Sequence, residues 1–166
     1  MRYTYKDISI RATEAADLDF IIPAENAEEN APYVAQWTRE QHLRAFENED
    51  VLHLVIEAQG RKVGYAIVAG LKDPNKCIEL KRIVIIEKGK GLGRSTLELF
   101  IKLAFEELGA HRLWLDVREY NQKAIHLYES LGFVREGLIR ECLLIDGKFV
   151  SHYIMSILVH EYKGNA

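Results

Sequence analysis

The sequence predicts an α+β protein with a mixed central β-sheet of about seven strands and about four flanking helices. A strand-helix-strand run over residues 77–118 requires a parallel crossover, and β-rich pairs joined by tight turns require antiparallel neighbours. The 166 residues, 48% of them hydrophobic, suffice for one domain with a full core. We therefore expect a single domain over residues 1–166, in two or three layers.

The first elements follow from periodicity and capping signals. Apolar residues alternate over residues 8–12, which predicts a strand. Thr13 is a suitable N-cap for a helix over residues 14–20. The polar stretch over residues 23–37 has no periodicity, so we expect an irregular segment there.

A helix and a hairpin follow this segment. Thr38 and Gln41 have the spacing of a capping box, which predicts a helix that continues through Phe46. The β-rich runs over residues 51–57 and 63–71 flank a short turn that contains a glycine. They therefore predict an antiparallel hairpin.

The middle of the chain combines a strand, a glycine loop and a helix. Residues 77–86 are strand-like, and the loop over residues 89–93 follows them directly. Gly109 suits the position after a helix C-terminus. The helix between loop and Gly109 has one apolar face, formed by Leu97, Phe100, Ile101, Ala104 and Leu108.

The last third repeats the alternation and ends in a hairpin. Residues 112–118 alternate as a strand, and Asn121 is placed to cap a helix that Gly132 ends. Two β-rich runs, 134–145 and 149–158, flank an Asp-Gly pair, which is a strong hairpin signal. Its exposed edge strand can pair between chains, so a homodimer is one expected assembly.

Composition excludes several classes of protein. The 22 Lys and Arg against 25 Asp and Glu give a net charge of −3, which disfavours nucleic acid and anionic membranes as partners. Cys77 and Cys142 form no Cys-x-x-Cys pair, and the six histidines lack metal-ligand spacing, so we expect no metal. There is no signal-peptide pattern and no long apolar stretch, which favours a reducing cytoplasm.

The glycine loop is a candidate anion site. It lies between a strand and a helix start, where unpaired backbone N–H groups and the helix dipole favour phosphate. It is no P-loop, because Arg94, Ser95 and Thr96 stand where Gly-Lys-Ser/Thr is required, and the dinucleotide fingerprint also fails on spacing. A solvated flexible turn and a plain nucleotide-phosphate binder both remain open from the loop alone.

Two motifs together carry a family resemblance. Lys88-x-x-Gly91-x-Gly93 resembles the acetyl-coenzyme A loop of the GNAT N-acetyltransferase superfamily, with Lys88 where Arg or Gln is usual. The second cofactor motif of that family is similar to Leu115-Asp116-Val117-Arg118, Asn121, Ala124, Leu127-Tyr128-Glu129-Ser130 and Leu131-Gly132-Phe133. The resemblance covers essentially the whole chain, and it is closest to the enzymes that acetylate ribosomal-protein N-termini.

The resemblance implies a GNAT fold and acetyl-CoA as the acyl donor. It places the pyrophosphate on the loop amides and cations, and the pantetheine arm along the strand. A backbone N–H of that strand would face the thioester oxygen. The implied cofactor residues are Arg82, Ile83, Lys88, Gly89, Lys90, Gly91, Leu92, Gly93, Arg94 and Asn121.

The resemblance also implies catalytic residues. Tyr128 matches the tyrosine that protonates the departing thiolate, although a core tyrosine would fit the same pattern. An amine acceptor must lose a proton before attack, and either Glu79 or Asp116 is a candidate base. Glu79 is expected in phase with Ile83 on its strand. Both carboxylates could equally be solvated surface groups.

The acceptor is expected beside residues 25–50 and the final hairpin. Residues 25–50 contain seven acidic and two basic residues, which suits a cationic acceptor, and a protein N-terminus, a polyamine and a small-molecule amine all stay open. Tyr33 and Trp37 are candidate lining residues. His152, near the last hairpin, is a further residue that could face the acceptor. The alternative to an N-acetyltransferase is a non-catalytic acyl-CoA binding or sensor domain.

Overall fold

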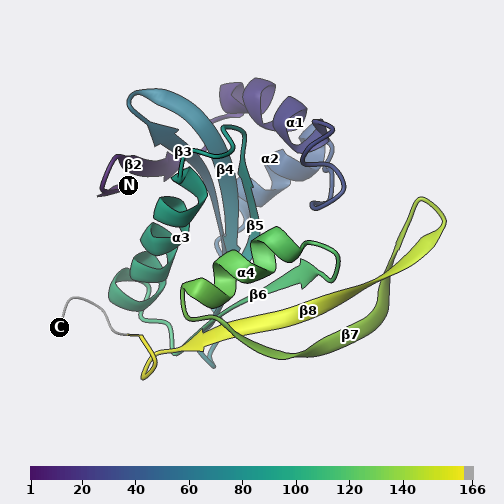
Figure 1. Ribbon diagram of the computed structural model, residues 1–166. Helices are drawn as coiled ribbons and strands as arrows, with labels where there is room; N and C mark the ends of the chain where they lie inside the picture. The colour runs from purple at the N-terminus through teal and green to yellow at the C-terminus, as the bar shows by residue number, and fades with distance from the viewer. Residues whose placement is uncertain (163–166) are drawn as a thin grey trace.

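The computed structural model describes residues 1–162, and within them eight strands form one mixed sheet in the order β1-β2-β3-β4-β5-β6-β8-β7. The predicted α+β class is confirmed (Figure 1). The prediction of one domain over residues 1–166 stays a prediction, since residues 163–166 lie outside the described part. The strands are β1 (Arg2–Tyr5), β2 (Ile8–Ala12), β3 (Val51–Ala58), β4 (Arg61–Ala69), β5 (Cys77–Ile85), β6 (Arg112–Arg118), β7 (Val134–Ile145) and β8 (Lys148–Leu158).

Helices cover both faces of the sheet, so the fold has three layers (Figure 1). One face carries α1 (Leu18–Asn26) and α2 (Arg39–Glu47). The other carries α3 (Leu92–Lys102), which continues as a π-helical turn, and α4 (Gln122–Ser130). None of the helices within residues 1–162 is both long and apolar enough to cross a membrane.

The start of the chain differs from the prediction. Glu14, not Thr13, is the N-cap of a short 3-10 turn that leads into α1, because the Asp17 carboxylate accepts the Glu14 N–H at 2.8 Å. The helix then runs to Asn26 with Pro23 inside it, although proline removes one helical hydrogen bond. Burial of the apolar face of α1 outweighs that loss. Strand β1 was missed, since its sequence Arg-Tyr-Thr-Tyr has no aliphatic alternation.

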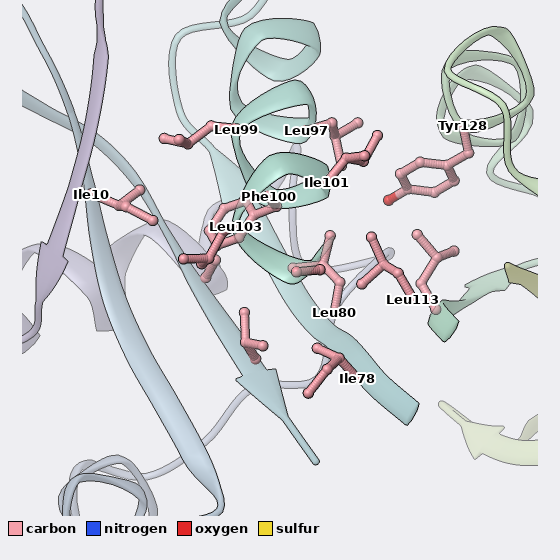
Figure 2. Packing of buried hydrophobic residues seen from close by; sticks show 14 of the residues in the cluster. Ile10, Ile78, Leu80, Leu97, Leu99, Phe100, Ile101, Leu103, Leu113 and Tyr128 are labelled. Atoms are coloured by element: carbon pink, nitrogen blue, oxygen red, sulfur yellow. The ribbon is translucent and has the colours of Figure 1, made fainter. Parts of the chain in front are cut away.

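The predicted apolar face of α3 forms the centre of the larger core. Leu97 and Phe100 are almost fully buried and belong to the same cluster as Ile78 and Leu80 of β5 (Figure 2). A smaller apolar cluster lies under α1 and α2 on the other face of the sheet. Apolar burial on both faces holds the strands in place for the site described next.

The hairpin of β7 and β8 turns where predicted. Asp146 and Gly147 have φ values of 49° and 76°, as a two-residue hairpin turn requires. Strand β7 is the edge of the sheet and is mostly exposed, and the hairpin extends away from the helices (Figure 1). The predicted exposed edge strand is therefore confirmed.

Candidate active site

Strands β5 and β6 pair only at their beginnings. Their parallel register ends with Glu79 opposite Trp114. Beyond this point β5 still pairs with β4 as far as Ile85, and β6 with β8 as far as Arg118. The facing edges of the two strands are therefore left without a strand partner over the rest of their length (Figure 1). Such edges offer backbone N–H and C=O groups to an amide chain.

A β-bulge lies on β5 at this opening. The register between β4 and β5 shifts so that Lys81 has no partner residue. The extra residue changes the alternation of side chains, and Ile83 packs into the core on the same face as Leu80. Glu79, between the core residues Ile78 and Leu80, points to the opposite face. The prediction that Glu79 is in phase with Ile83 is therefore wrong, because alternation cannot reveal a bulge.

The glycine loop has the backbone geometry of an anion site. Gly89 and Gly91 have φ values of 75° and 72°, and no atom lies within 4 Å of a Cβ built on either. Conformation rather than space therefore favours glycine at both positions. Gly91 is the N-cap of α3, whose first N–H groups have no acceptor within the helix. The loop fits a phosphate group.

The three cations of the loop are engaged with protein groups. Burial lowers the pKa of the Lys88 ammonium, which lies at a partly covered position. Each of these side chains has further N–H donors that can meet a phosphate. The three contacts are Lys88 Nζ to Asn30 Oδ1 at 2.8 Å, Lys90 Nζ to Glu87 Oε2 at 3.2 Å, and Arg94 Nη2 to Ser130 Oγ at 2.6 Å.

Tyr128 extends from α4 into the region between the helices and the sheet. Figure 2 shows its hydroxyl pointing from α4 into the core. Within residues 1–162 the hydroxyl makes no hydrogen bond, and burial together with the Asp116 carboxylate raises its pKa to about 12. Asn121, the predicted N-cap of α4, accepts the N–H of Ala124 at 3.3 Å. Helix α4 therefore holds Tyr128 with its hydroxyl free to donate a hydrogen bond.

The two candidate bases lie on adjacent strands, Glu79 opposite Trp114 and Asp116 two residues further along β6. Burial raises the pKa of Glu79, the Asp116 carboxylate raises it further, and Lys81 opposes both. Asp116 Oδ2 lies 3.5 Å from His152 Nδ1, and the buried Nε2 of His152 has no partner among the described residues. The Asp116 carboxylate raises the pKa of both Glu79 and Tyr128, with Glu79 on the α1/α2 face of the sheet and Tyr128 in the core cluster of the other face.

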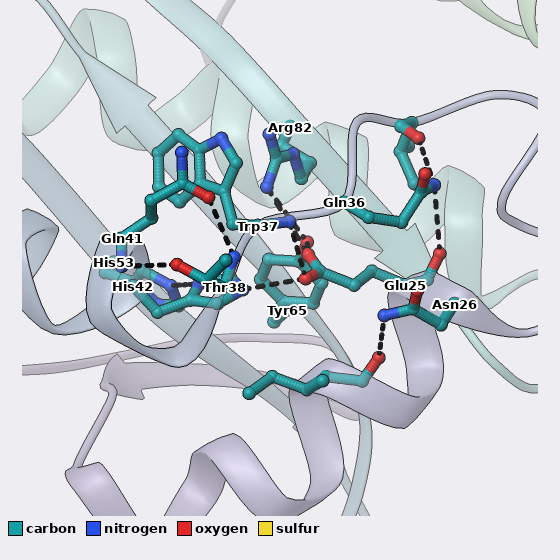
Figure 3. A network of polar contacts seen from close by, with 12 residues as sticks. Glu25, Asn26, Gln36, Trp37, Thr38, Gln41, His42, His53, Tyr65 and Arg82 are labelled. Atoms are coloured by element: carbon teal, nitrogen blue, oxygen red, sulfur yellow. Dashed lines mark hydrogen bonds and ion pairs between the residues drawn. The ribbon is translucent and has the colours of Figure 1, made fainter.

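A polar network on the α1/α2 face was not predicted (Figure 3). Glu25, one of the acidic residues counted for the acceptor region, is fully buried and receives hydrogen bonds from several elements. Its acidic neighbours are partly neutralised as well, since Arg44 pairs with Glu40. A signal existed in the sequence: Glu25 follows Leu18 and Ile21 at helical spacing, on the apolar face of α1.

Comparison with known proteins decides the family. The profile of the Acetyltransferase (GNAT) family matches residues 18–133. The chain belongs to the GNAT acetyltransferase family. Spermidine N(1)-acetyltransferase of Escherichia coli K12 is 28% identical, over 93% of this chain and 88% of the relative. The [ribosomal protein bS18]-alanine N-acetyltransferase of the same strain is 32% identical, over 80% of this chain and 84% of the relative.

A solved GNAT structure supports the same conclusion. Spermidine N-acetyltransferase of Vibrio cholerae, in complex with CoA and spermine, aligns with a TM-score of 0.85 and 27% identity, over 95% of this chain and 99% of that one. This GNAT protein is an acetyl-CoA-dependent N-acetyltransferase, as the two motifs predicted. The nucleotide-phosphate and non-catalytic alternatives are set aside on this ground.

Proposed function

We propose that the enzyme acetylates a primary amine of a cationic small molecule of the polyamine type. The observation that carries this proposal is the position of two carboxylates, Glu79 and Asp116, on adjacent strands where β5 and β6 part. Two carboxylates there attract an ammonium group and can accept its proton. The nearly full-length similarity to spermidine N-acetyltransferases supports the same acceptor class.

Glu79 is our candidate for the general base. An alkylammonium with a pKa of about 10 has no lone pair and must lose a proton before it attacks. Burial raises the pKa of Glu79 above its ordinary range, which makes it a stronger base than an exposed carboxylate. Asp116 contributes negative charge beside Glu79 and, with His152 beside it, is the alternative base.

Tyr128 is our candidate for stabilising the leaving thiolate. With a pKa of about 12 against about 8.5 for a thiol, complete proton transfer from tyrosine is uphill by roughly 5 kcal/mol. A hydrogen bond from its hydroxyl to the sulfur avoids that cost. The amine nitrogen forms the new bond to the acetyl carbon as the carbon–sulfur bond breaks, and Tyr128 donates to the sulfur that leaves.

We derive the proposed position of each part of the cofactor from the geometry of the opening between β5 and β6. We place the pyrophosphate on the α3 amides after Gly91, with Lys88, Lys90 and Arg94 neutralising its charge. We place the pantetheine arm along the open edge of β5 at Arg82 and Ile83. The Arg82 side chain is buried on the α1/α2 face, so its contribution to the cofactor is through the backbone.

Thiol release with two acceptors tests the acceptor and the roles together. Turnover is measured with spermidine and with a peptide that begins with alanine, for the wild type and for Tyr128→Phe, Glu79→Gln and Asp116→Asn. Tyr128→Phe should lower kcat about 100-fold with the Kd of acetyl-CoA unchanged. Tyr162→Phe is the matched control, because burial and Glu106 raise its pKa to about 12 as well, at a hydroxyl bonded to Glu106.

The outcomes separate the parts of the proposal. Glu79→Gln should remove the acid limb of the kcat/KM profile, and if only Asp116→Asn does so, the base is Asp116. Faster turnover of the peptide than of spermidine would contradict the polyamine proposal. An unchanged kcat in Tyr128→Phe would contradict its role at the thiolate.

We also propose where and how the enzyme works. The edge strand β7 can join copies of the chain, and a homologue from Vibrio cholerae has a dodecameric structure. The free thiols Cys77 and Cys142 suit a reducing cytoplasm. Gel filtration with light scattering, with and without spermidine, measures the assembly, and a monomer in both conditions would contradict the proposed pairing.

A further inference from the structure

Residues 27–38, between α1 and α2, form a bridging segment across the site. They contain turns but neither helix nor strand. On one side Asn30 Oδ1 accepts the Lys88 ammonium, just after the end of β5. On the other side the carbonyl of Pro32 accepts from Arg118, the last residue of β6, and from Tyr120. The bridging segment therefore contacts both strands that border the opening.

The inner end of the bridging segment is fixed by a buried carboxylate (Figure 3). Glu25 Oε1 accepts the backbone N–H of Trp37 at 3.0 Å and the ring of His42 at 2.9 Å. Glu25 Oε2 accepts the hydroxyl of Tyr65 at 2.5 Å and Nη1 of Arg82 at 3.4 Å. One side chain thus joins α1, the bridging segment, α2, β4 and β5.

The charges of this network set the direction of its hydrogen bonds. Burial by itself raises the pKa of Glu25, but the hydrogen bonds from His42 and Tyr65 outweigh it and lower the pKa overall. The ionised carboxylate requires that His42 donate from Nε2, so its Nδ1 accepts from His53 Nε2 at 2.9 Å. His53 Nδ1 then accepts from the hydroxyl of Thr13 at 2.9 Å. Each side chain in this series of hydrogen bonds therefore has a defined donor or acceptor partner.

Arg82 connects the network to the reacting end of β5. It follows the bulged residue Lys81, and its backbone lies on the open edge of the strand. Its guanidinium carbon lies 4.4 Å from the centroid of the Trp37 ring. Trp37 is thus attached to Glu25 through its N–H and to β5 through its ring. The distance between bridging segment and strand is set by these two contacts.

We infer that Glu25 is a positioning residue for the amine acceptor. It touches neither the cofactor loop nor the acceptor, and it acts by fixing the bridging segment at the distance from β5 that the acceptor requires. A buried carboxylate with several donors is costly to desolvate and adds little net stability, so stability alone does not account for it. The inference rests on the proposed function, because it assigns the bridging segment to the acceptor.

The experiment compares two buried carboxylates. Glu25→Gln removes the charge and turns one acceptor oxygen into a donor that faces other donors. Asp17→Asn is the matched control: Asp17 is 3% exposed and is bonded to Arg11 at 2.8 Å and Lys62 at 2.7 Å, away from the bridging segment. Both variants lose a buried charge, but only the first should affect the acceptor.

Hydrogen exchange and steady-state kinetics are the readouts. Amides of residues 27–38 should exchange at least 10-fold faster in Glu25→Gln than in Asp17→Asn. The KM for spermidine should rise about 10-fold in Glu25→Gln alone, with the Kd of acetyl-CoA no more than twofold above that of the wild type in both variants. Tyr65→Phe removes one donor to Glu25, so it should raise the exchange rates of residues 27–38 and the KM for spermidine by smaller factors. This variant replaces Glu25→Gln in the experiment if Glu25→Gln does not fold.

Equal exchange or equal KM in the two carboxylate variants would overturn the inference. A raised Kd for acetyl-CoA in Glu25→Gln would also overturn it, because the effect would then extend to the cofactor. If the wild type turns over neither spermidine nor the alanine peptide, the proposed acceptor fails. The exchange rates of residues 27–38 still decide in that case whether Glu25 anchors the bridging segment.

Discussion

The two faces of the sheet are built by different physical means. The α3/α4 face is a large apolar core with the glycine loop at its edge. The α1/α2 face has a small apolar cluster beside a network in which Glu25, His42 and Tyr65 are fully buried. The apolar face fixes the backbone where the cofactor is expected to bind. The polar face fixes side chains and the bridging segment, where the acceptor is expected.

The difference indicates how one fold combines cofactor chemistry common to the family with an acceptor specificity particular to this protein. Apolar burial is non-directional and tolerates substitutions that conserve volume, so it holds a common platform. A hydrogen-bonded network is directional, and removing one partner leaves the others unsatisfied. The acceptor side therefore depends on particular residues such as Glu25. Each prediction below changes one face and asks whether the other responds.

The largest effect is expected on the cofactor side. Gly91→Glu should weaken acetyl-CoA binding at least 1,000-fold, about 4 kcal/mol, because a carboxylate repels the pyrophosphate and the left-handed backbone disfavours a side chain. Isothermal titration measures the loss. Gly147→Glu in the hairpin turn is the control, since it has a φ value of 76° and equally open space. Equal weakening in both variants would show that strain, not the anion site, is responsible.

An effect of intermediate size is expected on the free energy of unfolding, because the polar face loses stability as the pH falls. Burial, with the Arg82 guanidinium nearby, lowers the pKa of His53 to about 3, whereas unfolded histidine titrates near 6.5. The unfolded state therefore binds the proton first, so the stability present above pH 6.5 is lost as pH falls towards 3. The loss should be about 3 kcal/mol at pH 4.

Urea unfolding between pH 7 and pH 4 measures this dependence. His53→Gln should flatten it, while replacement of the exposed His126 by Gln should leave it unchanged. A wild-type slope that His53→Gln does not alter would place the titrating group elsewhere. Titration of acetyl-CoA at the same pH values shows whether the cofactor side responds.

The smallest effect is expected where the two sides meet. Asn30→Ala frees the Lys88 ammonium for the cofactor phosphate, so the affinity for acetyl-CoA should rise two- to fivefold, less than about 1 kcal/mol. Asn26→Ala is the control: Asn30 Nδ2 donates to the helix carbonyl of Ala24 at 2.9 Å, and Asn26 Nδ2 likewise donates to that of Ile22 at 2.8 Å but without contacting Lys88. A lower affinity in Asn30→Ala would mean that Asn30 helps Lys88 to reach the cofactor.

Local signals in the sequence predicted most elements. The strand over residues 112–118 has the predicted bounds, and the capping box of Thr38 and Gln41 is present with both hydrogen bonds. Predictions from these signals were wrong where tertiary packing outweighed a local preference of the sequence. Pro23 does not end α1, because the buried face of that helix continues beyond it. Glu25 was counted among the charges of the acceptor region, although its spacing from Leu18 and Ile21 places it on the buried face of α1.

The sequence by itself determined the order of elements from β2 onward, the glycine loop and the two cofactor motifs, because these depend on contacts within a few residues along the chain. The tertiary structure alone decided where β5 and β6 part, where the bulge at Lys81 falls and which donors surround Glu25. These features join residues distant in sequence, such as Glu25 and Arg82, and no periodicity records such pairs. Packing of whole layers brings them together.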